Sequence, residues 1–329
     1  MMTKKYSIID LHADTPEFVL TDLKGGGNTL WKSRGHIDLP RLESAGALVQ
    51  VMAIFAPAKP LPYMPADYDV TAYFDRVYAA YQQALGACAS AVAPVYTYED
   101  IARNQSRGKI SFMLTLEDGA VLESNLQTLD VLFEKGVRMI TLTWNYENCL
   151  GYPNSRDPSV IEQGLKTFGK EAVRHMQDRG VIVDVSHLSD GGFWDVHGLC
   201  DKPFVASHSG CRALCDHPRN LTDDMLRALG DRGGVVGVTF CAPFLRPNET
   251  VSRISDILEH MLHIKNVAGM EALALGSDFD GIDSQLEFLD YGGLPQLFRA
   301  CEAVFTPREM DMITHENARR VFRDCLPHD

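Results

Sequence analysis

The feature that most constrains the fold is a regular alternation of two kinds of segment. Short, nearly continuous runs of apolar and β-branched residues recur along the chain, and longer stretches with helical spacing separate most of them. Such runs are typical of parallel strands that are covered by helices on one side and packed inside on the other. We predict eight strands, at residues 8–12, 48–55, 110–116, 138–143, 181–187, 203–208, 235–240 and 273–278.

The segments between the strands predict helices, several of which end at a glycine such as Gly136 or Gly180. Strand–helix alternation implies right-handed βαβ units, and eight of them favour a closed (β/α)8 TIM barrel over an open sheet. No GxGxxG motif opens a helix, which argues against a dinucleotide fold. We expect one catalytic domain over residues 1–329. The predicted helices are 68–85, 126–135, 164–179, 190–200, 222–231, 252–267 and 307–323.

The composition excludes several classes of protein. The 329 residues are 45% hydrophobic and 23% charged, which is an ordinary globular balance. The net charge of −13 argues against a nucleic-acid partner, because phosphate binding needs clustered Lys and Arg. The 8 cysteines contain no CxxC pair, and we see neither a signal peptide nor an apolar run of the ~18 residues that a membrane span needs. We expect a cytoplasmic protein that binds neither nucleic acid nor membrane.

Polar residues gather where the predicted strands end. The carboxyl ends of the strands form the active site in barrels of this type. His12 and Asp14 end the first strand, and residues two apart on a strand point to the same side. The ends of later strands carry Glu117, His187, His208 and Asp278.

A single histidine at a strand end is more often structural than a ligand. Three histidines, two aspartates and a glutamate at one end of a barrel would be costly to bury without a cation, so together they indicate a metal site. Imidazole and carboxylate ligands suit Zn²⁺, with Mn²⁺, Fe²⁺ or Co²⁺ as substitutes. Five ligands exceed the needs of one catalytic zinc, and a bridging Glu117 would divide them into two sets, which is hydrolytic geometry. The sets are His12, Asp14 and Glu117 for one ion, and Glu117, His187 and His208 for the other.

Other polar residues have a structural interpretation. The remaining histidines are expected in helices or loops without a ligand role. We expect Asp118 to point away from the site and Asp184 to face away from His187. Asp280 is interpreted as a turn residue.

Six segments match a known pattern in order and nearly end to end. They are 10–15 (DLHADT), 38–42 (DLPRL), 115–120 (TLEDGA), 184–187 (DVSH), 206–209 (ASHS) and 276–281 (GSDFDG). With these motifs the chain resembles the membrane dipeptidase (renal dipeptidase) family of zinc peptidases, a branch of the amidohydrolase barrels.

The resemblance implies a binuclear zinc hydrolase of small dipeptides, including those with a D-residue at the C-terminal position. A metal-bridging hydroxide would attack the peptide bond, with Glu117 as the bridging carboxylate. Asp278 would receive the proton of the bridging water and pass it to the leaving amine. Arg219 would pair with the substrate carboxylate, for which a planar fork is suited. The family also implies a homodimer.

Two positions depart from the family pattern. Members commonly place a histidine after the fourth strand to support the tetrahedral intermediate, whereas this chain has Trp144, which cannot take a positive charge. A family tyrosine that helps hold the substrate carboxylate appears as Phe244, which lacks the hydroxyl. We therefore expect Trp144 and Phe244 to alter the substrate pocket. We hypothesise that Asn145, Tyr146 or Asn148 supplies a polar contact to substrate.

Two other interpretations keep the same metal site. One is a hydrolase of the same barrel superfamily that acts on a lactone, an amidine or a phosphoester. The other is a metal-binding homologue with reduced catalysis. Glu117, and the absence of a lysine at the end of the fourth strand, favour the dipeptidase.

Overall fold

A closed barrel of parallel strands forms the centre of the molecule. The computed structural model describes residues 5–20 and 29–329, and within them eight strands follow the order β2-β1-β10-β8-β7-β6-β5-β4. The barrel closes because β4 also pairs with β2. The (β/α)8 prediction is confirmed. The barrel strands are β1 (Ile8–Asp10), β2 (Ala47–Phe55), β4 (Ile110–Glu117), β5 (Val137–Thr141), β6 (Ile182–Asp184), β7 (Val205–Ser209), β8 (Val235–Val238) and β10 (Leu273–Leu275).

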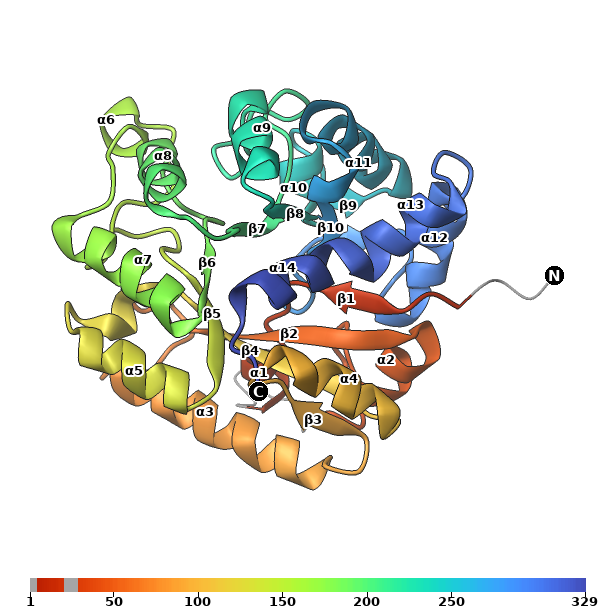
Figure 1. The fold of residues 1–329 in the computed structure, drawn as a ribbon, viewed down its shortest axis with the longest axis horizontal. Coiled ribbons are helices and arrows are strands. Elements are labelled where there is room, and N and C mark those ends of the chain that lie inside the picture. The colour runs from red at the N-terminus through yellow and green to blue at the C-terminus, as the bar shows by residue number, and fades with distance from the viewer. Residues whose placement is uncertain (1–4, 21–28) are drawn as a thin grey trace.

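Helices surround the barrel (Figure 1). Each predicted helix is present, with ends displaced by at most a few residues, and the glycines that follow α5 and α7 have positive φ, 97° at Gly136 and 77° at Gly180. The helices are α1 (Thr15–Leu20), α2 (Leu39–Ala45), α3 (Val70–Ala87), α4 (Tyr98–Ser106), α5 (Leu126–Glu134), α6 (Pro158–Ile161), α7 (Thr167–Arg179), α8 (Asp190–Leu199), α9 (Asp223–Asp231), α10 (Ala242–Leu245), α11 (Ile254–Ala268), α12 (Leu294–Cys301), α13 (Pro307–Asp311) and α14 (Asn317–Cys325). Short 3-10 turns lie at Gly119–Leu122, Met270–Ala272 and Tyr291–Gly293.

Several elements were not predicted from the sequence. Helices α2, α4 and α12 are among them, although Asp38 caps α2 by accepting a hydrogen bond from the Arg41 amide. Strand β3 (Val92–Pro94) pairs with the beginning of β4, while β5 pairs with its end. The predicted helix 307–323 is divided by a π-helical turn, Met312–Glu316, between α13 and α14.

Five barrel strands (β1, β5, β6, β8 and β10) end earlier than predicted, and for β1 and β6 aspartate side chains give the reason. β1 ends at Asp10, whose carboxylate accepts the Ser277 amide at 2.8 Å. β6 ends at Asp184, whose carboxylate accepts the amides of Ser186 at 3.0 Å and Ser207 at 2.9 Å. At both positions a carboxylate takes the place of a backbone carbonyl as acceptor, so the regular ladder is interrupted there.

The interior of the barrel is filled by side chains. Ile9, Val51 and Met139 belong to an apolar cluster that also includes Val321 and Phe322 of α14. Helix α14 is anchored beside the beginnings of β7 and β8, because the Cys325 thiol donates to the Pro203 carbonyl and Arg320 donates to that of Gly233. The amino-terminal end of the barrel is therefore covered by α14, which leaves the carboxyl end for chemistry.

Loops at the carboxyl end are tied together by a small second sheet. β9 (Val251–Ser252) pairs in parallel with β11 (Gln285–Leu286). This pairing joins the loop after β8 to the loop after β10, on one side of the site. Within the described part of the chain, no helix is long and apolar enough to cross a membrane.

The backbones of β7, β8 and β10 pack closely at Gly276, so we predict that a larger residue there lowers the stability of the protein. A Cβ added at Gly276 would lie 1.7 Å from the Ser207 carbonyl oxygen, whereas a Cβ at Gly86, in α3, would meet no atom within 4 Å. We expect Gly276→Ala to lower the free energy of unfolding by about 1–3 kcal/mol or more, because the backbone must move. Gly86→Ala is the control and is expected to raise it by about 0.5–1 kcal/mol. Urea unfolding of both variants checks this, and equal stabilities would contradict the packing argument.

Candidate metal centre and active site

The predicted ligands meet at the carboxyl end of the barrel. Glu117 is the last residue of β4 and His208 lies in β7. His12, His187 and Asp278 lie two or three residues beyond β1, β6 and β10, so they are held by loops rather than by strands. The segment after β1 stays extended, because Ala13 bridges to Phe279.

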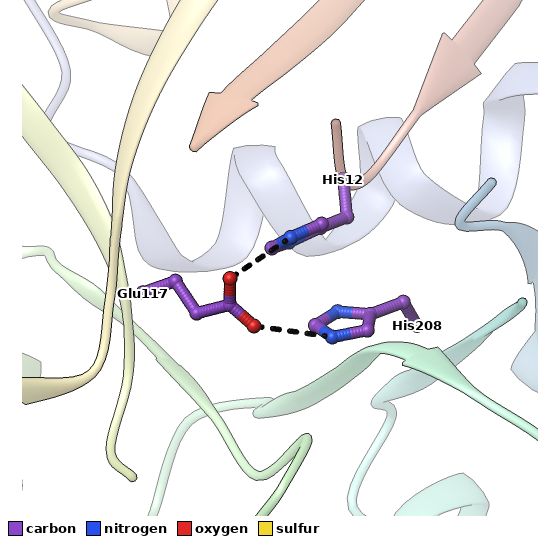
Figure 2. A group of neighbouring side chains, drawn as sticks. All are labelled: His12, Glu117 and His208. Carbon is purple, nitrogen blue, oxygen red and sulfur yellow. Dashed lines mark ion pairs between the residues drawn. The ribbon is translucent and has the colours of Figure 1, made fainter. Parts of the chain in front are cut away.

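Glu117 is the centre of the cluster and is 3% exposed. Its Oε2 lies 3.6 Å from His12 Nε2, while its Oε1 lies 3.1 Å from His187 Nε2 and 3.5 Å from His208 Nε2. Figure 2 shows the carboxylate between His12 and His208. Asp14 Oδ2 is 3.5 Å from His12 Nε2. The two oxygens of Glu117 thus face two different groups of side chains.

Burial and charge shift the pKa values of this cluster strongly. Burial, helped by Arg219, lowers the pKa of His187 to about 3. Burial, helped by the charge of His12, holds the pKa of His208 well below its usual value. Burial also lowers the pKa of His12, but the attraction of Glu117 and Asp14 outweighs it and the net pKa lies well above the usual value. The cluster therefore combines neutral imidazoles with closely opposed charges.

The carboxylic acids of the site also respond to burial. Burial and the neighbouring Glu117 raise the pKa of Asp14 to about 6. Burial raises the pKa of Asp278 well above its usual value, against the opposing effect of His12. A divalent cation would offset the repulsion among these carboxylates, which is the condition under which such groups stay ionised in a buried site.

Buried polar atoms without a hydrogen-bond partner show whether a metal ion would fit among these side chains. Both ring nitrogens of His12 and Oδ1 of Asp14 are buried without a hydrogen-bond partner among the described residues. Ligand atoms of His12, Glu117 and His208 lie within 4.8 Å of one another, and so do those of His12, Asp14 and Asp278. Nitrogen and carboxylate ligands of this kind suit zinc. The residues fit a metal centre.

Unusual backbone conformations place several of these side chains. His187 has φ 66° and Asp278 has φ 63°, in the left-handed region that non-glycine residues rarely adopt. Such a conformation costs about 1–3 kcal/mol and is found mostly at functional sites. Gly281 allows the close approach of two carboxylates, because a Cβ there would lie 2.0 Å from Asp14 Oδ2 and 2.7 Å from Asp278 Oδ1.

A cavity of about 540 Å³ opens beside the ligands. Glu117, His187 and Asp278 line it, together with Trp144 and Phe244. Aromatic rings form one wall of this cavity. The centre of the Trp144 ring lies 4.9 Å from that of Phe55 and 6.0 Å from that of His187. The lining further includes Asp14, Asn145, Leu61, Tyr63 and Ile282.

Arg219 lies behind this lining rather than in it. Its guanidinium is 5.2 Å from the Phe244 ring centre, and the residue is 4% exposed. Nη2 donates to the His208 carbonyl at 3.0 Å, whereas Nε and Nη1 have no partner among the described residues. Two buried donors thus remain available for an anion.

The polar residues proposed after β5 have separate positions. Asn145 lines the cavity, and its Oδ1 lies 3.0 Å from His187 Nδ1. Asn148 is buried and uses its amide on Asp118 at 2.6 Å and on the Leu142 carbonyl at 2.8 Å. The structure therefore gives Asn148 a structural contact and does not place it or Tyr146 among the lining residues.

Sequence reasoning missed the aspartates that support the ligands. Asp184 was expected to face away from His187, and its carboxylate accepts hydrogen bonds from Thr141, Ser186 and Ser207. Its hydrogen bonds to Ser186 and Ser207 were not predicted, because the predicted strand ran through His187 whereas β6 ends at Asp184.

Two further acidic residues have contacts that the sequence did not reveal. Asp280 is more than a turn residue, because it accepts hydrogen bonds from Thr15 at 2.8 Å and from the His36 amide at 2.6 Å. Asp118 accepts the Ala58 and Ala120 amides, which holds the loop after β2 against the end of β4.

Comparison with known proteins assigns the family. The family model described as membrane dipeptidase (peptidase family M19) matches residues 1–326. An uncharacterized dipeptidase of Schizosaccharomyces pombe is 32% identical over 302 residues, which is 85% of this chain and 70% of that protein. An uncharacterized protein in the pqqA 5′ region of Klebsiella pneumoniae is 33% identical over 235 residues, or 68% of this chain and 86% of that protein.

Solved structures agree with this assignment. The structure of dipeptidase AC, a metallopeptidase of family M19, is 26% identical with a TM-score of 0.88, covering 98% of this chain and 99% of that one. A metallopeptidase from Rhodobacter sphaeroides, liganded with a phosphinate mimic of L-Ala-D-Ala, shares the fold at 24% identity with a TM-score of 0.88, covering 98% and 100%. The chain belongs to the membrane dipeptidase family and is a metallo-dipeptidase, a zinc-dependent hydrolase.

Proposed function

We propose that this protein is a binuclear zinc dipeptidase that cleaves small dipeptides, including those of the form L-Xaa-D-Xaa. The observation that carries the proposal is the division of Glu117 between two groups of ligands. Oε2 faces His12, which in turn lies beside Asp14, and Oε1 faces His187 and His208. One carboxylate that serves two groups of side chains is what two neighbouring ions require.

His12, Asp14 and Glu117 would hold one ion, and Glu117, His187 and His208 the other. When bound, zinc ions supply Lewis-acid activation of a water molecule and of the scissile carbonyl. The ligating nitrogen of a histidine must be unprotonated, so His12 would hold zinc as a neutral imidazole.

Asp278 is the residue positioned to move the proton. Its carboxylate lines the cavity beside Glu117 and lies within the group that includes His12 and Asp14. A carboxylate here accepts a proton from the attacking water and returns it to the leaving amine. The left-handed backbone at Asp278, where its amide donates to the His12 carbonyl at 3.2 Å, fixes the carboxylate near the ligands.

Arg219 would bind the terminal carboxylate of the substrate. Its Nε and Nη1 donors are buried and unpaired among the described residues, and Phe244 covers the guanidinium face. A dipeptide carboxylate that reaches these donors would place the peptide bond toward the ligands. Phe244 has no hydroxyl that could donate to this carboxylate, so Arg219 would supply most of the hydrogen bonds that bind it.

The first prediction concerns catalysis by Asp278. On a matched panel of L-Xaa-L-Xaa and L-Xaa-D-Xaa dipeptides, we expect hydrolysis by the wild type and a loss of about 10²–10⁴-fold in kcat for Asp278→Asn, because the amide cannot take the proton. Metal content is measured on the same preparations and should be two zinc per chain in both. Asp224→Asn, on the surface of α9, is the control.

Two outcomes of that panel would contradict the proposal. If Asp278→Asn retained wild-type kcat, another group would carry the proton. If the wild type bound two zinc ions but cleaved no dipeptide, Trp144 and Phe244 would have redirected the site. Esters, lactones and amidines would then be the substrates to assay.

Metal removal should lower stability. Zinc binds only the folded arrangement of ligands, and at a free concentration 100-fold above Kd each site adds about 2.7 kcal/mol to the free energy of unfolding. We expect chelation to lower Tm and added zinc to restore it. Glu117→Ala should show a much smaller zinc-dependent change, since both ligand groups lose a member. A chelated wild type shown to be free of metal, with unchanged Tm, would contradict a zinc centre at these residues.

The role of Arg219 is tested with paired substrates. Arg219→Lys should raise KM for a free dipeptide about 10-fold or more, because lysine cannot present two fixed donors to a carboxylate. The same dipeptide with an amidated C-terminus removes the anion and should be cleaved with similar kcat/KM by variant and wild type. An equal loss on both substrates would assign Arg219 to structure instead.

A further inference from the structure

We infer that Asn145, and Asp184 acting through Ser207, are positioning residues that fix the tautomers of His187 and His208, so that both imidazoles present an unprotonated Nε2 to the metal centre. The inference deepens the proposed function, since it rests on these two imidazoles being zinc ligands. It reassigns Asn145, which the sequence had suggested as a substrate contact.

The argument for His208 begins at Asp184, which is fully buried. Its Oδ1 accepts the amides of Ser186 and Ser207 at 3.0 and 2.9 Å. Its Oδ2 accepts the hydroxyls of Thr141 and Ser207, both at 2.6 Å. A carboxylate that receives four donors acts only as an acceptor, so the single hydroxyl proton of Ser207 is directed to Asp184.

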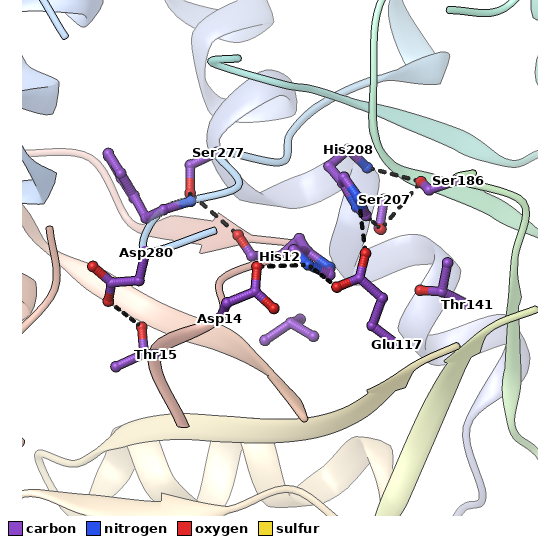
Figure 3. Close-up of polar contacts among 12 residues, drawn as sticks. His12, Asp14, Thr15, Glu117, Thr141, Ser186, Ser207, His208, Ser277 and Asp280 are labelled. Carbon is purple, nitrogen blue, oxygen red and sulfur yellow. Dashed lines mark hydrogen bonds and ion pairs between the residues drawn. The ribbon is translucent and has the colours of Figure 1, made fainter. Parts of the chain in front are cut away.

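Ser207 can then only accept from its other neighbours. Its Oγ lies 2.8 Å from His208 Nδ1, and with its proton already used it must receive the imidazole N–H. His208 is therefore protonated at Nδ1 and carries a lone pair at Nε2. Figure 3 shows Ser207 and His208 beside Glu117.

The tautomer of His187 is set by an amide pair. Its Nδ1 lies 3.0 Å from Asn145 Oδ1. The amide nitrogen of Asn154 donates to the same Oδ1 at 3.1 Å and to the His187 carbonyl at 3.2 Å. Because Asn154 presents its nitrogen to both atoms, Asn145 must present its oxygen to His187. The His187 Nδ1 then carries the proton and Nε2 the lone pair.

The consequence is a convergence of unprotonated atoms. His187 Nε2 and His208 Nε2 lie 3.1 Å apart, and both lie within 3.5 Å of Glu117 Oε1. With both tautomers fixed, none of the three atoms has a proton to share, and a bound cation would satisfy all of them together. Partners that hold the far nitrogen of a metal-binding histidine usually raise metal affinity in this way.

His12 provides a contrast within the same site. Neither of its ring nitrogens has a hydrogen-bond partner among the residues that the structure describes. Its ring instead lies against that of His208, with centroids 3.8 Å apart. No hydrogen bond within the described chain holds either of its ring nitrogens, so hydrogen-bond partners fix the tautomers of only two of the three histidines.

Two measurements on the protein test this inference, and neither needs a substrate. Long-range ¹H–¹⁵N NMR of histidine-labelled, metal-free protein at pH 8 reports which ring nitrogen carries the proton. Competition with a chelator of known affinity reports zinc binding. For the wild type we expect Nδ1–H on both His187 and His208.

The variants separate the role of each positioning residue. Ser207→Ala should release the His208 tautomer and weaken zinc binding about 10–100-fold. Ser207→Thr keeps the hydroxyl and should restore both properties. Ser209→Ala, a matched serine in β7 whose hydroxyl has no partner among the described residues, should behave as wild type.

A second pair of variants guards against a folding defect at the buried Ser207. Asn145 is exposed, so Asn145→Leu should fold and release the His187 tautomer with a similar loss of zinc affinity. Asn145→Asp keeps an oxygen acceptor and should rescue both measurements.

The inference is overturned if metal-free wild type carries its proton on Nε2 of His208 or His187. It is also overturned if Ser207→Ala and Asn145→Leu change neither the tautomers nor zinc affinity. A wild type with the expected tautomers and zinc affinity that cleaves no dipeptide supports this inference while it refutes the proposed function.

Discussion

The burial of the Glu117 carboxylate among three imidazoles is the contact on which the site depends. A carboxylate so enclosed is costly unless every oxygen faces a positive or donating group. Its two oxygens face His12 on one side, and His187 and His208 on the other. The barrel makes this possible, because strands distant in sequence end at one rim. Without a cation, the same geometry would leave lone pairs and charges in opposition.

Two similar aspartate–serine contacts hold that rim in place. Asp10 receives the amide and hydroxyl of Ser277 at 2.8 and 2.6 Å, and Asp184 receives those of Ser207 at 2.9 and 2.6 Å. Each contact joins neighbouring strands directly before a residue of the site, Asp278 in one case and His208 in the other. The aspartate ends its own strand and fixes the position from which the next strand presents its side chain. The same aspartate–serine contacts thus end one strand and place the site residue on its neighbour.

These contacts also explain what the sequence could and could not predict. The eight strands were predictable, because a barrel strand is buried on both faces and reads as a continuous apolar run. The convergence of polar residues at strand ends predicted the cluster around Glu117, and the structure brings that cluster together. The role of Asp184 was not predictable from alternation, since that argument assumed a strand through His187. The strand ends at Asp184 and the chain turns at His187 with φ 66°, so the count of residues no longer determines the direction of a side chain.

The aromatic wall of the cavity and the cluster around Glu117 are held in place by different interactions. The ligands are placed by strand ends and by buried hydrogen bonds, whereas Trp144 and Phe244 are held by aromatic contacts with Phe55 and His217 at 4.9 and 4.6 Å. Contacts of this kind tolerate a change of side chain more easily than a buried hydrogen-bond network, in which any lost partner leaves an unsatisfied group. The side chains at positions 144 and 244 can therefore change without disturbing Glu117. The shape of this cavity wall is free to vary while the cluster around Glu117 stays the same.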